Sequence, residues 1–136
     1  MPTVGILGGG QLGLMLAESL DRLGQDVVVL EADADSPCAQ RRSNVISGGP
    51  ADPGALATFF SRVDVATFDS ENTPAPPLVP YASKLAPSLR VLEVTQDRAK
   101  EKTFLRDHGF RTVKFELVAP CADVKAAVHR FGLPCI

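Results

Sequence analysis

GILGGGQLG, residues 5–13, joins a short apolar run to a segment in which leucines recur at helical spacing. The run at residues 4–7 predicts a buried strand, and the three consecutive glycines predict a tight turn after it. Leucines 12, 16, 20 and 23 fall near one face of a helix over residues 11–23, which Gly24 is expected to end. The stretch therefore predicts a strand, a glycine turn and a helix in immediate succession.

The residues that follow extend this unit into a layered fold. Residues 27–30 form a continuously apolar run, as expected for a strand covered on both faces, so the first thirty residues predict a right-handed βαβ unit. A short helix is expected at 39–42, a weak strand at 44–47, a helix from Asp52-Pro53 to about 62, and a strand at 64–68. The fold class is α/β, with a doubly wound parallel sheet up to about residue 70.

The composition of the chain changes after Asn72, where prolines become frequent. The segment TPAPPLVP (residues 73–80) predicts an irregular loop or a helix started by proline. Helices are expected at 88–94, 97–108 and 122–131. The alternating segment VKFELV (113–118) predicts a strand covered on one face, and LPCI (133–136) predicts the start of another.

The composition and charge of the chain exclude several classes of partner and of protein. The chain has 136 residues, a formal net charge of −2 and three cysteines. Its basic residues are dispersed, so neither nucleic acid nor a membrane surface is an expected partner. No CxxC motif, basic leader or membrane-length apolar run occurs. We therefore expect a cytoplasmic soluble protein with incidental thiols.

The glycine turn leaves three interpretations open. Gly8, Gly10 and Gly13 satisfy G-x-G-x-x-G, and Glu31 ends the second predicted strand, where an acid could bind a ribose hydroxyl. A dinucleotide is one candidate ligand. Another phosphorylated ligand at the helix N-terminus is the second, and a purely structural turn is the third.

Two further motifs are candidates for ligand contacts. DSENTPAP (69–76) follows the fourth predicted strand, so Glu71 and Asn72 could face a ligand held by Gly10, Gln11 and Leu12. The alternative is a solvated loop with an Asx turn at Asn72. In TQDRAKEK (95–102), Asp97 is a predicted N-cap, and Arg98 in the first turn opposes the helix dipole. Arg98 is therefore a candidate anion ligand, or part of a solvated charged face.

Together the motifs resemble a known family. GILGGGQLGLMLA, VVVLEADADSPCAQ, DVATFDSENTPA, VTQDRAKEKTFLRDHGFRT and LPCI are similar, in order and spacing, to the N-terminal part of the N5-carboxyaminoimidazole ribonucleotide synthetases, which are ATP-grasp enzymes. The resemblance covers nearly the whole chain. It implies a Rossmann-like pre-ATP-grasp domain over residues 1–90 and the beginning of an ATP-grasp domain over 91–136. One departure is Asp69-Ser70, where the family has an acidic-aromatic pair.

The resemblance also implies a function. The complete enzymes use ATP, magnesium and bicarbonate to carboxylate aminoimidazole ribonucleotide in purine biosynthesis, and their N-terminal region helps to form dimers. Gly10, Gln11, Leu12, Glu71 and Asn72 are then expected to bind the ribonucleotide, and Arg98 to contact ATP.

The family's ATP phosphate cradle and metal-binding acids are expected beyond the 136 residues. The chain is therefore expected to be a truncated piece, inactive alone and without catalytic or metal-binding residues of its own. The alternatives are an NAD(P)-binding module and a non-catalytic interaction fragment.

Overall fold

The computed structural model describes residues 1–118 and 121–135. The chain forms two compact units, Met1–Gln96 and Asp97–Ile136. The first unit contains the sheet, and the described part of the second contains two helices.

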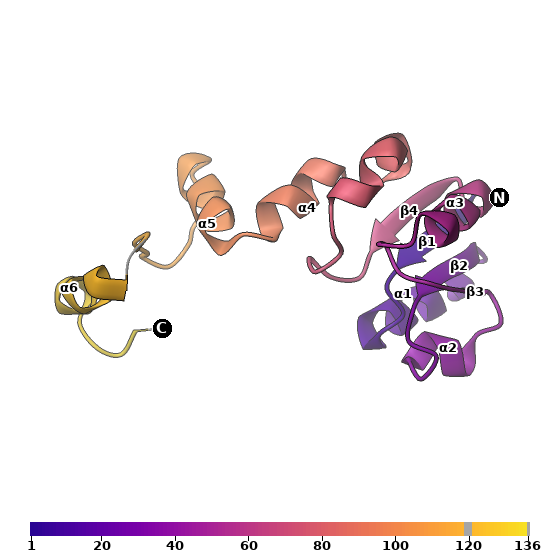
Figure 1. Cartoon of the computed structure of the whole chain (residues 1–136), viewed down its shortest axis with the longest axis horizontal. Helices are drawn as coiled ribbons and strands as arrows, with labels where there is room; N and C mark the ends of the chain where they lie inside the picture. The colour runs from indigo at the N-terminus through magenta and orange to yellow at the C-terminus, as the bar shows by residue number, and fades with distance from the viewer. Residues whose placement is uncertain (119–120, 136) are drawn as a thin grey trace. The chain divides into compact units, whose positions relative to one another are not determined.

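The first unit is built on a four-stranded parallel sheet with the strand order β3-β2-β1-β4 (Figure 1). Its strands are β1 (Thr3–Leu7), β2 (Asp26–Glu31), β3 (Val45–Ser47) and β4 (Val65–Phe68). Gly5 of β1 lies opposite Val28 of β2 and Ala66 of β4. The predicted doubly wound parallel sheet is confirmed, with β1 as a central strand.

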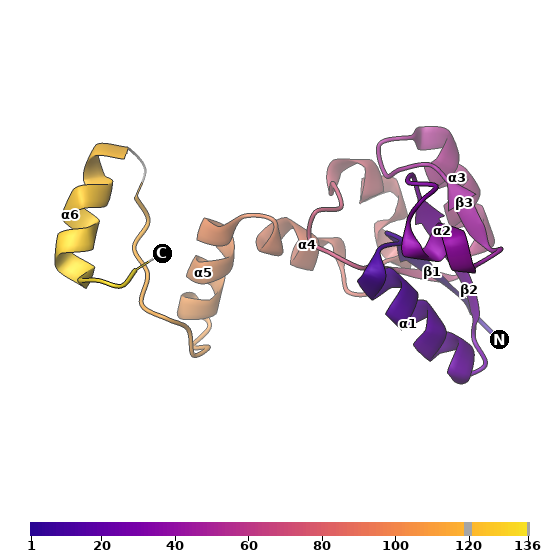
Figure 2. The same ribbon diagram turned by 90° about the horizontal axis from the view of Figure 1, so that it is seen from below.

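One face of the sheet is covered by α1 (Gln11–Arg22) and α2 (Pro37–Arg41). Ile6, Val27 and Val29 point to this face and pack with Leu14 and Cys38 in one apolar cluster. Figure 1 shows both helices on the side of the sheet away from α3 (Pro53–Arg62), and Figure 2 shows them from below, in front of the strands.

The other face is covered by α3, by the 3-10 helix η1 (Pro76–Lys84) and by α4 (Leu89–Thr95). Phe59 of α3 is fully buried. Its ring reaches the backbone of β1, because a Cβ at Gly5 would lie 2.4 Å from Phe59 Cζ. Full burial of such a side chain contributes about 1.5–3 kcal/mol to folding. The proline-rich segment thus forms the proline-started helix, one of its two predicted alternatives.

The second unit contains α5 (Arg98–Asp107) and α6 (Cys121–Phe131). The predicted strand at 113–118 is wrong: the segment has no regular secondary structure (Figure 2). A strand needs a neighbour for its backbone hydrogen bonds, and residues 97–118 and 121–135 contain no other strand. The strand predicted to start at 133 is also absent over residues 133–135, and Ile136 lies outside the described residues.

Among the helices that the structure describes, none combines the length and the apolar character needed to cross a membrane.

Candidate functional site

Three loops meet at the edge of the sheet where β1, β2 and β4 end. Since the strands are parallel neighbours, the loops that leave them emerge together. These are the glycine turn (8–13), the acidic turn (31–35) and the loop at 69–73. We call this group of loops the carboxyl edge. It contains every predicted site residue except Arg98.

The glycine turn is shaped by close backbone approaches. Gly8 has a φ of +106°, which other residues rarely adopt. A Cβ at Gly13 would lie 2.3 Å from the carbonyl oxygen of Gly8, so only glycine lets α1 begin this close to the end of β1. Gly13 thus permits tight packing of the helix against the end of the strand.

The first turn of α1 exposes backbone donors. Gly10 is the N-cap and supplies no side-chain cap, while its carbonyl accepts from the N–H of Leu14 at 2.9 Å. Among the hydrogen bonds of the described residues, none has the N–H of Gln11 or Leu12 as its donor. Both side chains are exposed. The two amides therefore remain available at the positive end of the helix dipole.

Glu31, at the end of β2, is already engaged with the chain. Its Oε2 accepts from the N–H of Gly9 at 2.6 Å, and its Oε1 accepts from the N–H of Asp33 at 2.8 Å. Both carboxylate oxygens thus tie the acidic turn to the glycine turn. This arrangement gives Glu31 a structural role, which sequence reasoning did not predict.

Asp69 is a site residue that sequence reasoning missed. Its backbone N–H donates to the carbonyl of Leu7 at 3.1 Å, which continues the pairing of β4 with β1. A Cβ at Gly8 would lie 2.0 Å from Asp69 Oδ1, so the carboxylate occupies the space above that glycine. Burial raises the pKa of the Asp69 carboxyl; the Gly10 amide lowers it, and the charge of Glu31 raises it. The available signal was an acid placed directly after a strand that neighbours the glycine turn.

Glu71 and Asn72 are exposed on the loop that follows β4. The backbone N–H of Asn72 donates to Ser70 Oγ at 3.4 Å. Thr73 is buried, and its carbonyl accepts a hydrogen bond from the side-chain amide of Gln96. Among the described residues, no hydrogen bond or ion pair joins Glu71 to the glycine turn. The fold brings the two motifs to one edge without joining them directly.

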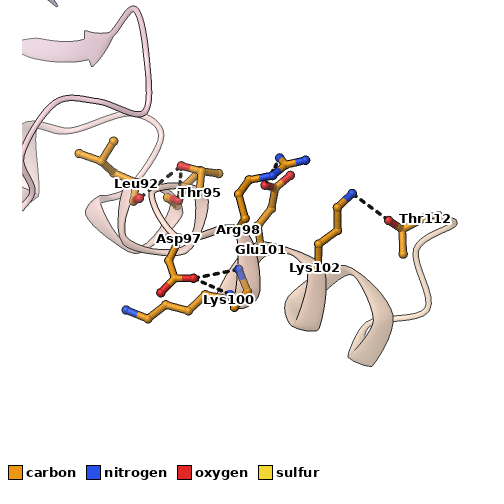
Figure 3. Close-up of polar contacts among 10 residues, drawn as sticks. Leu92, Thr95, Asp97, Arg98, Lys100, Glu101, Lys102 and Thr112 are labelled. Atoms are coloured by element: carbon orange, nitrogen blue, oxygen red, sulfur yellow. Dashed lines mark hydrogen bonds and ion pairs between the residues drawn. The ribbon is translucent and has the colours of Figure 1, made fainter. Parts of the chain in front are cut away.

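Arg98 lies in the second unit, at the start of α5 (Figure 3). Asp97 caps this helix by accepting from the N–H groups of Ala99 at 2.8 Å and Lys100 at 3.2 Å. The predicted N-cap is confirmed. The guanidinium of Arg98 forms an ion pair with Glu101 and is three-quarters exposed, with a relative side-chain exposure of 75%. The neighbouring carboxylates therefore offset the unfavourable position of a cation at a helix N-terminus.

In residues 1–118 and 123–135, no three side chains of His, Cys, Asp or Glu lie together as metal ligands. Magnesium prefers several oxygen ligands, often carboxylates. The described side chains therefore include no cluster of three that could hold magnesium by itself.

Comparisons with known proteins agree with this architecture. The sequence model of the ribonucleotide synthetase preATP-grasp domain matches residues 1–96. N5-carboxyaminoimidazole ribonucleotide synthase of Brucella melitensis is 40% identical in an alignment that covers 96% of this chain and 36% of the relative. The Staphylococcus aureus (strain COL) synthase is 35% identical over 98% of this chain and 36% of its own length. The chain thus spans about a third of the curated relatives it matches.

Solved structures give the same result. The synthetase from Thermus thermophilus superposes with a TM-score of 0.82 at 36% identity, over 96% of this chain and 37% of the other. The synthase from Aspergillus clavatus in complex with ADP and 5-aminoimidazole ribonucleotide superposes with a TM-score of 0.81 at 32% identity, over 98% and 37%.

Proposed function

Because the chain belongs to the ribonucleotide synthetase preATP-grasp family, we propose that its carboxyl edge is the ribonucleotide-binding side of an ATP-dependent ligase. The ligase carboxylates 5-aminoimidazole ribonucleotide with bicarbonate in purine biosynthesis. The observation that carries the proposal is the meeting of the glycine turn and the loop after β4 at one edge of a parallel sheet. In addition, an Aspergillus clavatus relative with this fold was solved with that ribonucleotide.

The chemistry of the carboxyl edge suits a ribonucleotide. The free N–H groups of Gln11 and Leu12 are hydrogen-bond donors to ligand oxygens, and Gly10 lets a ligand approach the backbone closely. The exposed Glu71 carboxylate and Asn72 amide offer acceptors, and the amide also offers donors. A ribose hydroxyl both donates and accepts, so it is matched by this mixture of groups.

For ATP, we propose a single contact from this chain, the guanidinium of Arg98. The support is its exposure and its position at the start of α5. Arginine suits phosphate oxygens because its planar N–H groups can bind two of them at once. Glu101 now holds the guanidinium, so a phosphate would have to displace it. No step of the reaction is assigned to magnesium, since the described residues contain no cluster of ligands for it.

Calorimetric titration of the chain with 5-aminoimidazole ribonucleotide tests the proposal. We expect saturable binding, and we expect Glu71→Gln to weaken it about tenfold, because a hydrogen bond to a charged group contributes about 1.5 kcal/mol or more. Glu93→Gln, at an exposed position on α4, is the matched control and should bind like the unmodified chain. Binding of NAD without any response to the ribonucleotide would overturn the proposal in favour of a dinucleotide-binding module.

A further inference from the structure

Two carboxylates of the chain already occupy the glycine turn. Glu31 comes from β2 and Asp69 from the end of β4, and these strands flank β1 on either side. Glu31 accepts from the N–H of Gly9 at 2.6 Å. A phosphate-binding turn of this type ordinarily offers its amides to the ligand, with no carboxylate in the way.

Asp69 is the carboxylate that reaches the start of α1. Its Oδ2 lies 3.5 Å from the position of a Cβ on Gly10 and 3.3 Å from that of a Cβ on Gly13. These separations are at or close to van der Waals contact, so the Asp69 carboxylate lies directly beside the start of α1. The half-buried Asp69 carboxylate therefore lies beside a helix N-terminus at which the amides of Gln11 and Leu12 donate no hydrogen bond among the described residues.

We propose that Asp69 makes the first turn of α1 a subsite for a neutral hydroxyl group of the ribonucleotide and excludes the phosphate from it. This inference rests on the proposed function for the identity of the ligand. A hydroxyl group donates its proton to the carboxylate and accepts from a backbone amide at the same time. The phosphate monoester of the ribonucleotide is mostly dianionic at neutral pH, so it has little to donate, and two like charges in contact repel each other. Asp69 thus determines which end of the ligand lies against α1.

Titration with inorganic phosphate tests the exclusion without any need for the ribonucleotide. The amide resonances of Gly10, Gln11 and Leu12 are followed by NMR at constant ionic strength. We expect the unmodified chain to show no saturable shift there, and Asp69→Asn to bind phosphate at least tenfold more tightly. Asp26→Asn removes the same charge at an exposed position at the start of β2 and should behave like the unmodified chain.

Asp69→Ser provides a second variant if the asparagine side chain disturbs the turn. Phosphate binding to the turn of the unmodified chain, within twofold of the affinity of Asp69→Asn, would overturn the inference. So would the absence of any gain in both Asp69 variants.

A comparison of 5-aminoimidazole ribonucleotide with its dephosphorylated riboside tests which end of the ligand lies on the turn. We expect both to shift the amides of Gln11 and Leu12 in the same direction at saturation, with the riboside binding more weakly. Shifts that require the phosphate would overturn the inference. If neither molecule shifts any resonance, the proposed function fails, and the phosphate titration still decides whether Asp69 excludes anions.

Discussion

At the scale of single residues, Asp69 predicts how stability depends on pH. Burial raises the pKa of its carboxyl in the folded chain; the amides of Gly10 and Gly13 act in the opposite direction, and the charge of Glu31 adds to the increase. A carboxyl whose pKa is higher in the folded than in the unfolded state favours folding while it is protonated. That contribution is present below the unfolded pKa, about 3.9, and is lost as the pH rises through the folded value.

We therefore expect Asp69→Asn to have a higher melting temperature than the unmodified chain at pH 7. The neutral side chain avoids the cost of a half-buried charge, and its carbonyl oxygen can still face the same amides. The difference should shrink as the pH is lowered toward 4, as measured by circular dichroism during heating. Asp26→Asn is the control and should show no such trend. A difference that grows on acidification would contradict the assigned direction of the pKa.

Gly13 gives a steric prediction. A Cβ at this position would lie 2.3 Å from the carbonyl oxygen of Gly8, which is backbone and cannot rotate away. We expect Gly13→Ala to destabilise the first unit by about 1–3 kcal/mol, as other overpacking substitutions do. This loss exceeds the gain of up to about 1 kcal/mol from the better helix propensity of alanine.

Urea unfolding followed by circular dichroism measures the effect of Gly13→Ala. Gly49→Ala is the matched control, because its new Cβ would meet Ala32 Cβ at an ordinary 3.7 Å. Equal unfolding midpoints for the two variants would show that the backbone at Gly8 relaxes easily. The close approach would then not be what requires glycine at position 13.

At the scale of single residues, the sequence predicts part of the candidate site but not all of it. The positions of Gly10, Gln11 and Leu12 at the start of a helix followed from the order of apolar run, glycines and leucines. The engagement of Glu31 and Asp69 with the turn did not. It depends on the register of β2 and β4 against β1. For example, Gly9 and Glu31 are 22 residues apart in sequence, and the register places them within hydrogen-bond distance.

At the scale of elements, Lys84 links η1 to the end of α3. Its Nζ donates to the carbonyl oxygens of Phe60 and Val63, each at 2.7 Å, and thereby satisfies groups at the C-terminal end of α3. We expect Lys84→Met to destabilise the first unit by about 1.5–3 kcal/mol, the range for hydrogen bonds to a charged group. The methionine keeps most of the apolar contact of the lysine stem.

The measurement for Lys84→Met is again urea unfolding. Arg90→Met removes a positive charge from an exposed position on α4 and serves as the control. A loss of stability that is equal in both variants would assign the effect to net charge. The hydrogen bonds from Lys84 to the two carbonyl oxygens would then not explain the loss of stability.

The elements that were predicted and those that were not differ in what stabilises them. The strands and helices of residues 1–96 have clear sequence patterns of apolar residues, caps and turns. Each strand pairs with a neighbouring strand, and the helices pack on the sheet of the same unit. The segment 113–118 carries the alternation of a strand, yet it has no strand to pair with among the described residues. Alternation describes a face that could be buried, whereas hydrogen bonding to a neighbour decides whether a strand forms.

At the scale of the whole molecule, the two units differ in how much they bury. The first unit contains both apolar clusters of the structure's described residues. Among residues 97–118 and 123–135, whose side chains the structure describes, Ala127 alone is buried, and Phe110, Val113, Leu117 and Leu133 are exposed. Local stability follows buried apolar contact, so the free energy of opening should be much lower in the second unit than in the first.

Hydrogen exchange followed by mass spectrometry measures this difference. We expect peptides from α5 and α6 to exchange within seconds to minutes at pH 7, while peptides from β1, β2 and α3 remain protected for hours. The physical reason is that isolated helices of this length are marginal in water without packing. Limited proteolysis should accordingly cut within residues 97–135 before it cuts the first unit. Protection of α5 and α6 equal to that of β1 would show that the second unit has a core that its exposed side chains do not indicate.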